Sequence, residues 1–476
     1  MLKFIDSVLC QFRPCFSRSA AFEWFAVVVL GLMIRSDYLG ITSIIRDLSL
    51  NPCCYECLNH FFRSAAWSLE GLLSTWVNVV RNHAPVYRVD GAAVLIGDGI
   101  KVPKEGRRMP AVQKLHQESE NSSKAPYIFG HLLGAVGVIV GGPTKLSCLP
   151  LHLQLQAGVK TIFSWAEGES QRQESHVVQL LQQAYEAGKS FGKTLLLLDR
   201  YFLSVHVLRC LQLLNQAGAK MNIITRAKRS CIAYEKPSYK PGKGRPRKKG
   251  AKLKLFELFS DRAEQFKEAA VTLYGKRETV RYLCLDLMWG QRLYQELRFV
   301  LVKYNGRYAI LVSTDLTLAA TTIIELYGLR FKIESMFRAL KHSLGGLAYQ
   351  FWSKSMPKLK RYLKKDEVPP LEQISDKKDK QNILQTIKAT EGYVTWCCIA
   401  MGILQMLALR YSSSGLPRPF RYLRTRSRGI VSEATIMDYL RKSIFRMFAK
   451  NSQLTITQII KSKQLNCNSD EDLLVP

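Results

Sequence analysis

Four polar side chains with a regular spacing lie in the segment 327–341. Tyr327, Arg330, Glu334 and Lys341 follow one another at intervals of three, four and seven residues. Because an α-helix repeats every ~3.6 residues, these intervals place all four side chains on one helical face. A carboxylate between two cations and a phenol is an unusual choice for a solvated surface. It suits a site that holds a metal ion and a phosphate.

Two further carboxylates follow short apolar runs. Asp98 comes directly after Ala92–Gly97, and Asp199 comes directly after Thr194–Leu198. Each run predicts a buried strand with an acid at its carboxyl end, where ligands gather in α/β sheets. Mg²⁺ prefers oxygen ligands and binds through a few carboxylates and substrate phosphates. Two strand-end Asp residues and Glu334 could therefore form a metal cage.

These residues resemble the signature of the DDE transposases of bacterial insertion sequences, in the group marked by Tyr, Arg, Glu and Lys at Y-x2-R-x3-E-x6-K. The resemblance covers roughly residues 90 to 410. It implies a ribonuclease-H-like core in which Asp98, Asp199 and Glu334 are the catalytic, metal-binding triad. Two Mg²⁺ ions are expected there, with Mn²⁺ as a substitute. One departure is that Arg200–Phe202 follow the second Asp directly, where many members have a Gly before an aromatic residue.

Several side chains are expected to hold DNA phosphates near such a site. Arg330 and Lys341 would bind phosphates beside the scissile bond, and Tyr327 would donate a hydrogen bond to one. Lys101 and Lys104 lie in a polar, basic segment after Asp98 that is expected to form a loop at the mouth of the site.

Composition favours a polyanionic partner. The net charge is +31, with 69 Lys and Arg against 38 Asp and Glu. Phosphate contacts dominate the affinity of such proteins for nucleic acids. Charge alone leaves anionic membranes and ribosomal RNA open, and the carboxylate triad favours DNA.

The twelve cysteines do not predict a disulfide framework, because they are scattered through a long chain. Cys53, Cys54 and Cys57 with His60 suggest zinc, but no second ligand pair follows at finger spacing. We expect reduced thiols. The apolar segments Phe25–Ile34 and 383–409 predict core helices rather than membrane spans. A cytoplasmic protein associated with the bacterial nucleoid is expected, with no membrane partner.

The expected fold class is α/β, with a ribonuclease-H-like catalytic core that a mainly β insertion domain interrupts, after a helical N-terminal domain. Two short helices around Asn51-Pro52 fit either a DNA-binding helix-turn-helix or an ordinary helical hairpin. The expected boundaries are 1–88 for the N-terminal domain, 89–230 and 318–410 for the core, 231–317 for the insertion, and 411–476 for a basic C-terminal region.

The insertion begins with a basic stretch, Lys236–Lys254, which contains nine Lys or Arg and no acid. Gly244-Arg245-Pro246 resembles the core of an AT-hook, which lays Arg in a narrow minor groove. The alternative is a solvated basic loop. Trp289 is the only Trp between Asp199 and Glu334. In the family an insertion-domain Trp stacks on a flipped base, whereas the commoner role of a Trp is in a core.

The expected activity is cleavage at the ends of an insertion sequence, through a hairpin intermediate, and transfer of the 3′ ends into target DNA. The expected partners are double-stranded terminal inverted repeats and target DNA, bound by a homodimer. Two rival hypotheses remain: a ribonuclease-H-like nuclease that cuts without joining, and an inactive transposase relic that only binds DNA.

Overall fold

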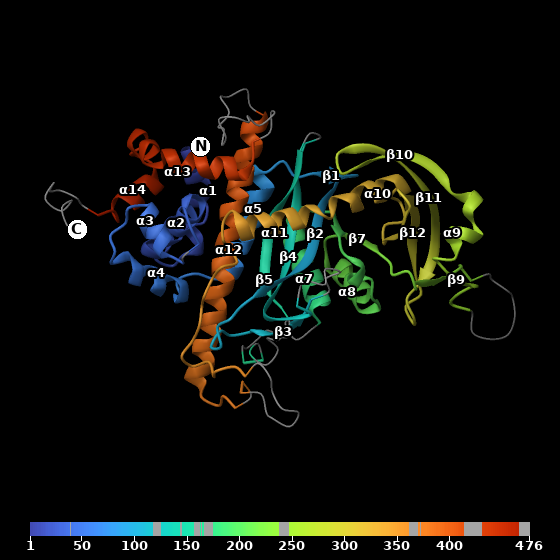
Figure 1. Cartoon of the computed structure of the whole chain (residues 1–476), viewed down its shortest axis with the longest axis horizontal. Helices are drawn as coiled ribbons and strands as arrows, with labels where there is room; N and C mark the ends of the chain where they lie inside the picture. Colours follow the sequence, from blue (N-terminus) through green and yellow to red (C-terminus); the bar gives the residue numbers. More distant parts are fainter. Residues whose placement is uncertain are drawn as a thin grey trace.

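The structure is a computed structural model of the whole chain. It describes residues 1–38, 40–117, 125–142, 145–156, 162, 164–165, 175–237, 247–360, 370–371, 373–413 and 431–465. The architecture is α/β: a large mixed sheet runs through the molecule, and helices cover it (Figure 1).

Five neighbouring strands form the part of the sheet that carries the predicted carboxylates. Their order is β5-β4-β2-β6-β7. The strands β2, β4 and β5 pair antiparallel, whereas β6 and β7 run parallel to β2. Their bounds are β2 Ala92–Pro103, β4 Tyr127–Gly142, β5 Lys145–Leu155, β6 Thr194–Leu197 and β7 Met221–Arg226. The short strands β1 (Arg88–Val89) and β3 (Gln113–His116) pair with β2 and β4.

The apolar runs form strands because both of their faces are covered. Every residue of β6 and the first six residues of β2 are buried, as expected for parallel strands between helical layers. Helix α7 (His176–Lys189) leads into β6 and packs on β2 and β4. Helix α8 (Val205–Ala217) connects β6 to β7 and begins at Ser204, whose hydroxyl accepts a hydrogen bond from the Val207 N–H.

The region 232–313 is rich in β structure, as predicted. Its strands are β8 Ile232–Tyr234, β9 Lys252–Lys254, β10 Lys267–Leu273, β11 Lys276–Trp289, β12 Gln295–Tyr304 and β13 Arg307–Ser313, with the short helix α9 at Leu258–Asp261. The strands β12 and β13 form a hairpin, with Asn305 and Gly306 of its turn at φ values of 44° and 69°. This region has a hydrophobic cluster of its own. Its sheet is continuous with the rest because β13 pairs with β7.

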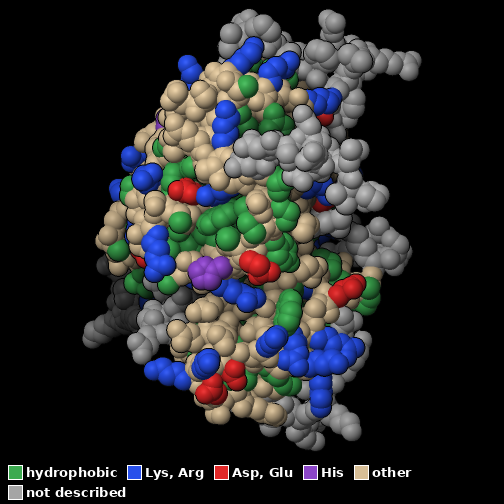
Figure 2. Space-filling view, turned by 90° about the vertical axis from the view of Figure 1, so that its left-hand side faces the viewer, with side chains coloured by type: hydrophobic (Ala, Val, Ile, Leu, Met, Phe, Trp, Pro, Cys, Tyr) green, Lys and Arg blue, Asp and Glu red, His purple; other side chains and the backbone are tan. Residues whose placement is uncertain are grey.

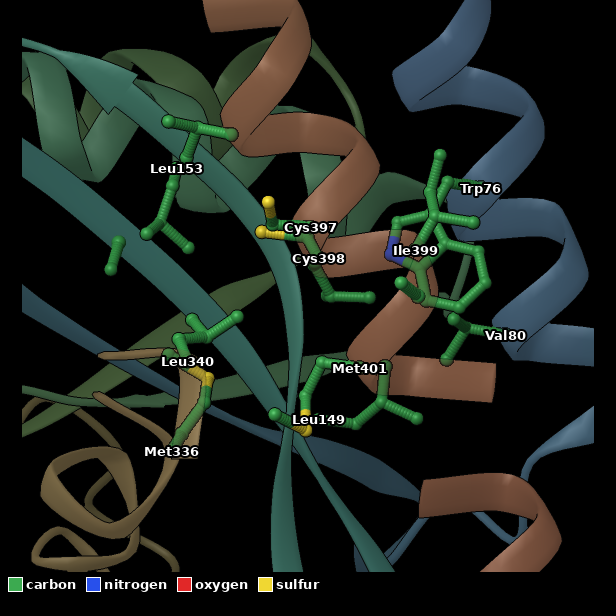
Figure 3. Packing of buried hydrophobic residues seen from close by; sticks show 14 of the residues in the cluster. Trp76, Val80, Leu149, Leu153, Met336, Leu340, Cys397, Cys398, Ile399 and Met401 are labelled. Carbon is green, nitrogen blue, oxygen red and sulfur yellow. The ribbon is translucent and has the colours of Figure 1, made fainter. Parts of the chain in front are cut away.

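A single long helix, α12 (Lys377–Ser413), separates the sheet from a layer of shorter helices. It packs on β5 on one side and on α2, α4, α5 and α13 on the other. Figure 3 shows Cys397, Cys398 and Met401 of α12 between Leu149 and Leu153 of β5 and Trp76 of α5. The helix is long and apolar enough to cross a membrane, but 94% of its apolar window is buried inside the protein. It is therefore the core helix that the sequence predicted.

The shorter helices come from both ends of the chain. They are α1 Leu2–Cys10, α2 Ser19–Ile34, α3 Thr42–Asp47, α4 Cys54–Arg63, α5 Leu69–His83, α13 Glu433–Lys450 and α14 Thr455–Lys461. The pair α3 and α4 lies where the sequence predicted two short helices around Asn51-Pro52. Helices α13 and α14 were not anticipated. All of these helices, α3 included, contribute side chains to the same hydrophobic cluster as β2, β6 and α12.

Two glycines of α12 allow close approach of indole rings from the helical layer. A Cβ at Gly402 would lie 2.2 Å from the ring of Trp76, and one at Gly392 would lie 2.4 Å from the ring of Trp67. The Trp76 indole N–H donates to the carbonyl of Pro150 on β5 at 2.9 Å. This contact ties α5, α12 and β5 together.

The N-terminal helices also hold the end of α11 (Lys332–His342), which carries Glu334. Arg35 follows α2, is buried, and donates two hydrogen bonds to the carbonyl of Leu344. The Tyr38 hydroxyl donates to the carbonyl of His342. The helical layer therefore helps to position α11 against the sheet.

We expect Arg35→Met to destabilise the protein by roughly 1–3 kcal/mol, because it leaves a buried carbonyl without a donor. Urea unfolding followed by circular dichroism would measure this change. Arg81→Met is the matched control, since Arg81 lies exposed near the end of α5. Equal unfolding midpoints for the two variants would show that the Arg35 contacts contribute nothing.

Candidate active site

Asp98 lies in the middle of β2 rather than at the end of a strand, so the sequence prediction was wrong on this point. Beyond Asp98 the strand continues to Pro103, because its pairing with β4 continues through Asp98↔Ala135 to Pro103↔Gly130. Its pairing with β6, in contrast, ends at Ile96↔Leu197. Asp98 therefore lies just beyond the last residue of β2 that pairs with β6.

Asp199 follows the carboxyl end of β6, as predicted. Its carboxylate accepts a hydrogen bond from the Arg200 N–H at 2.7 Å and caps one turn of 3₁₀ helix, Arg200–Phe202. Its carbonyl accepts a hydrogen bond from the Thr225 hydroxyl at the end of β7, at 2.8 Å. The turn that lacks a glycine is thus held by side-chain and backbone contacts.

The segment 327–341 is two helices rather than one. Helix α10 (Ala320–Leu329) ends before Arg330, and α11 begins at Lys332. At the joint, Arg330, Ile333 and Glu334 donate backbone bonds to the residue three positions earlier. This tighter turn keeps Arg330 and Phe331 in right-handed helical conformation. The predicted facing of Arg330 and Glu334 therefore survives the break.

Arg330 joins two of the predicted carboxylates. Its Nη1 donates to Asp98 Oδ2 at 3.0 Å, and its Nη2 donates to Glu334 Oε1 at 3.2 Å. The side chains of Arg330 and Asp98 are 18% and 24% exposed, whereas Glu334 is 63% exposed. The positive guanidinium thus lies between a carboxylate of the sheet and a carboxylate of α11 and binds both.

The electrostatics of the group follow from burial and from the clustered carboxylates. Burial raises the pKa of Asp98, and the charge of Asp199 adds to the rise, although Arg330 opposes both. Burial lowers the pKa of Arg330, but the charges of the surrounding acids raise it by more. Burial is the main cause that raises the pKa of Tyr327 to about 12. The charges of Asp98 and Asp199 also raise this pKa, and those of Arg330 and Arg226 lower it. The Tyr327 phenol is therefore protonated at neutral pH and can donate a hydrogen bond.

Arg226 is a member of this group that the sequence reasoning missed. It is the last residue of β7, and its charge acts on Tyr327. The available signal was its place at the carboxyl end of the strand that follows Asp199 in the chain.

Other predicted site residues lie further away. Lys341 is exposed, two helical turns beyond Glu334 on α11. Lys101 is exposed on β2, and its ammonium donates to the carbonyl of His116. Trp289 ends β11 and packs, half-buried, against the hydrophobic cluster of the β-rich region. Arg245 lies outside the described residues.

The structure does not bring Lys104 to the carboxylates. Lys104 is buried, and its ammonium donates to the carbonyls of Leu347 and Tyr349 at 2.8 and 2.6 Å. Burial lowers its pKa to about 7. The hydroxyl of Tyr349 in turn meets His131 Nδ1 at 2.8 Å. The segment expected to be a basic loop is thus partly a strand and partly an internal anchor for the chain after α11.

The donor chemistry of the three carboxylates fits a hard cation, although the side chains are not gathered into a coordination shell. Among the described residues no group of three or more His, Cys, Asp or Glu lies closely enough to hold a metal ion, and this includes the Cys53–His60 cluster. Asp98 and Glu334 nevertheless converge on one positive group, and Asp199 interacts with the same group. Carboxylate oxygens such as these are the ligands that Mg²⁺ prefers. The eleven described cysteines are all free.

No protein-family model matches this chain, and no curated protein sequence matches it.

Protonation of His131 should destabilise the fold. His131 is fully buried, and burial, together with the charge of Lys104, lowers its pKa to about 4. The unfolded chain, with an ordinary pKa of about 6.5, therefore binds more protons between these two values. Stability is fully present above pH 6.5 and falls by up to about 3 kcal/mol as the pH drops towards 4. Urea midpoints from pH 4 to 8 would measure the slope, and His131→Gln should flatten it. An unchanged slope in that variant would contradict the assignment.

Proposed function

We propose that this protein is a DDE transposase of the Y-x2-R-x3-E-x6-K group. The observation that carries the proposal is the pair of hydrogen bonds from Arg330 to Asp98 and to Glu334. These two carboxylates are far apart in the sequence, and the folded chain brings them to one guanidinium that belongs to the same signature.

The strand order supports a ribonuclease-H-like core. Three antiparallel strands, β5, β4 and β2, are followed by two strands parallel to β2 that are linked through a helix. Asp98 on the central strand and Asp199 after its parallel neighbour then face the helix that carries Glu334. The β-rich region between Asp199 and Glu334 matches the insertion expected for this group.

Each side chain has a role that its surroundings suit. When bound, Mg²⁺ held by Asp98, Asp199 and Glu334 would activate the attacking oxygen and stabilise the leaving oxygen of an in-line displacement at phosphorus. Arg330 neutralises the carboxylates and can turn a free N–H towards a phosphate oxygen. Tyr327 keeps its proton and donates to phosphate. Positioning and charge neutralisation thus do most of the work.

The charge distribution supports double-stranded DNA as the partner. Lys and Arg side chains are spread over the face shown in Figure 2 and outnumber the Asp and Glu side chains there. The terminal inverted repeats and the target DNA are the proposed substrates, bound by a homodimer because both ends of an element must be held together. A hairpin intermediate and association with the nucleoid belong to the same proposal.

The first test is cleavage of a supercoiled plasmid that carries this gene with its native flanking DNA. Wild-type protein with Mg²⁺ should release the element and form joined products, and chelator should prevent both. Asp98→Asn, Asp199→Asn and Glu334→Ala should each lower cleavage by at least about 10³-fold, while Glu334→Ala keeps its affinity for the ends. Cutting without joining would favour a nuclease. Binding without cutting by the wild type would indicate a relic.

Lys341→Ala should weaken both cleavage and the binding of the element end, because it removes one phosphate contact on the exposed face of α11. The slope of log affinity against log salt should fall by about 0.9. Lys461→Ala, an exposed lysine at the end of α14, is the control. If the two variants bind the end equally well, Lys341 has no role in holding DNA.

A further inference from the structure

Away from the carboxylates, three surface hollows share lining residues, and together they are termed the groove. The first, of about 450 Å³, lies between the start of α2, the end of α4 and α12. The second, of about 390 Å³, shares Arg63 and Gln385 with it. The third, of about 380 Å³, shares Trp352 with the second and includes residues 106–109, just after β2. In Figure 1, α4 lies beside α12, and residues of both helices line the first two hollows.

The groove is basic along its whole length. Its charged lining residues are Arg18, Arg63, Arg107, Arg108, Lys354 and Lys358, with His60 beside them and no Asp or Glu among the described lining residues. The chain as a whole has 38 acids to 69 Lys and Arg. The groove is therefore more strongly positive than the average surface of an already basic protein, as expected for a path that follows a phosphate backbone.

Trp352 lies at the centre of this groove, between the second and third hollows. All seven Trp residues are described, and Trp352, at 50%, is the only one whose side chain is exposed. Its backbone is held in place, because Arg63 donates to the Trp352 carbonyl at 3.2 Å. Arg108 also donates to the carbonyls of Lys354 and Met356. A large aromatic ring left exposed on an anchored backbone is a platform for stacking.

We propose that this groove binds an unpaired strand of DNA, with a base stacked on Trp352 and phosphates on the cations at either side. Stacking on an aromatic platform inside a positive groove is how proteins bind single strands without regard to sequence. Hollows of about 380 to 450 Å³ are large enough for a base or a sugar-phosphate unit.

The position of the groove connects it to the candidate active site. Strand β2 carries Asp98 in its middle and ends at Pro103, three residues before the groove residue Gly106. The five residues of strand from Asp98 to Pro103 span about 17 Å. Exposed Lys101 lies between the two sites on the same strand. A strand separated near the cleaved end can therefore reach the groove. This connection rests on the proposed function, whereas the groove itself does not.

The test measures binding of a fluorescein-labelled 12-nucleotide oligothymidine by anisotropy, in chelator so that metal-dependent chemistry is absent. Trp352→Ala should weaken binding roughly five- to 150-fold, and Trp352→Phe should keep most of the affinity because a phenyl ring still stacks. Tyr439→Ala, which removes an exposed aromatic ring on α13, is the control and should have no effect. Arg107→Ala should lower the salt slope by about 0.7.

Unlabelled duplex of the same length should compete at least about tenfold less well than the single strand. Equal binding by Trp352→Ala and wild type would overturn the proposal, as would equal competition by duplex or by polyglutamate. The plasmid assay with Asp98→Asn is scored separately. Loss of single-strand binding in Trp352→Ala in a protein that cuts no plasmid would support the groove and reject the transposase.

Discussion

Burial of α12 is the constraint on which the rest of the structure depends. A 37-residue helix with a long apolar stretch is stable in water only if other elements cover it on all sides. The sheet covers one side through β5, and helices from both ends of the chain cover the other. Because α11 packs on both β5 and α12, the same burial sets the position of Glu334 relative to β2. Helices of the first 83 residues are therefore part of the support of the site, whatever contacts their outer surfaces make.

A second constraint is the repulsion between carboxylates at the open edge of β2. Asp199 lies close enough for its charge to raise the pKa of Asp98, and the Asp98 side chain is largely buried. Arg330 offsets this cost by binding Asp98 and Glu334 together. Arg330 lies in the tight joint between α10 and α11. From this position its guanidinium reaches both Asp98 and Glu334. The same positive charge marks the position that a hard cation would favour.

The remaining polar features divide between internal support and external binding. Lys104, His131 and Tyr349 form a buried network that fastens the chain after α11 to β2 and β4. The exposed cations around Trp352 border open hollows, although Arg63 and Arg108 also donate to backbone carbonyls of this segment. Residues 104 and 107 are near neighbours in the sequence and have opposite roles. Both residues lie beyond the end of β2 at Pro103. Lys104 is buried because its ammonium binds the carbonyls of Leu347 and Tyr349, whereas Arg107 is exposed.

The sequence by itself determined the local elements and which carboxylates belong to the candidate site. The apolar runs before Asp98 and Asp199 became strands, the long apolar segment became α12, and Asn305-Gly306 formed a hairpin turn, because periodicity and turn chemistry act over a few residues. Only the tertiary structure decided that Asp98 lies in mid-strand, since this depends on how far β4 pairs with β2. Tertiary packing likewise buried Lys104, brought Arg226 near enough for its charge to act on Tyr327, and left Trp352 exposed among cations. Contacts between segments distant in the chain set these outcomes, and no local pattern records which distant segment will cover a side chain.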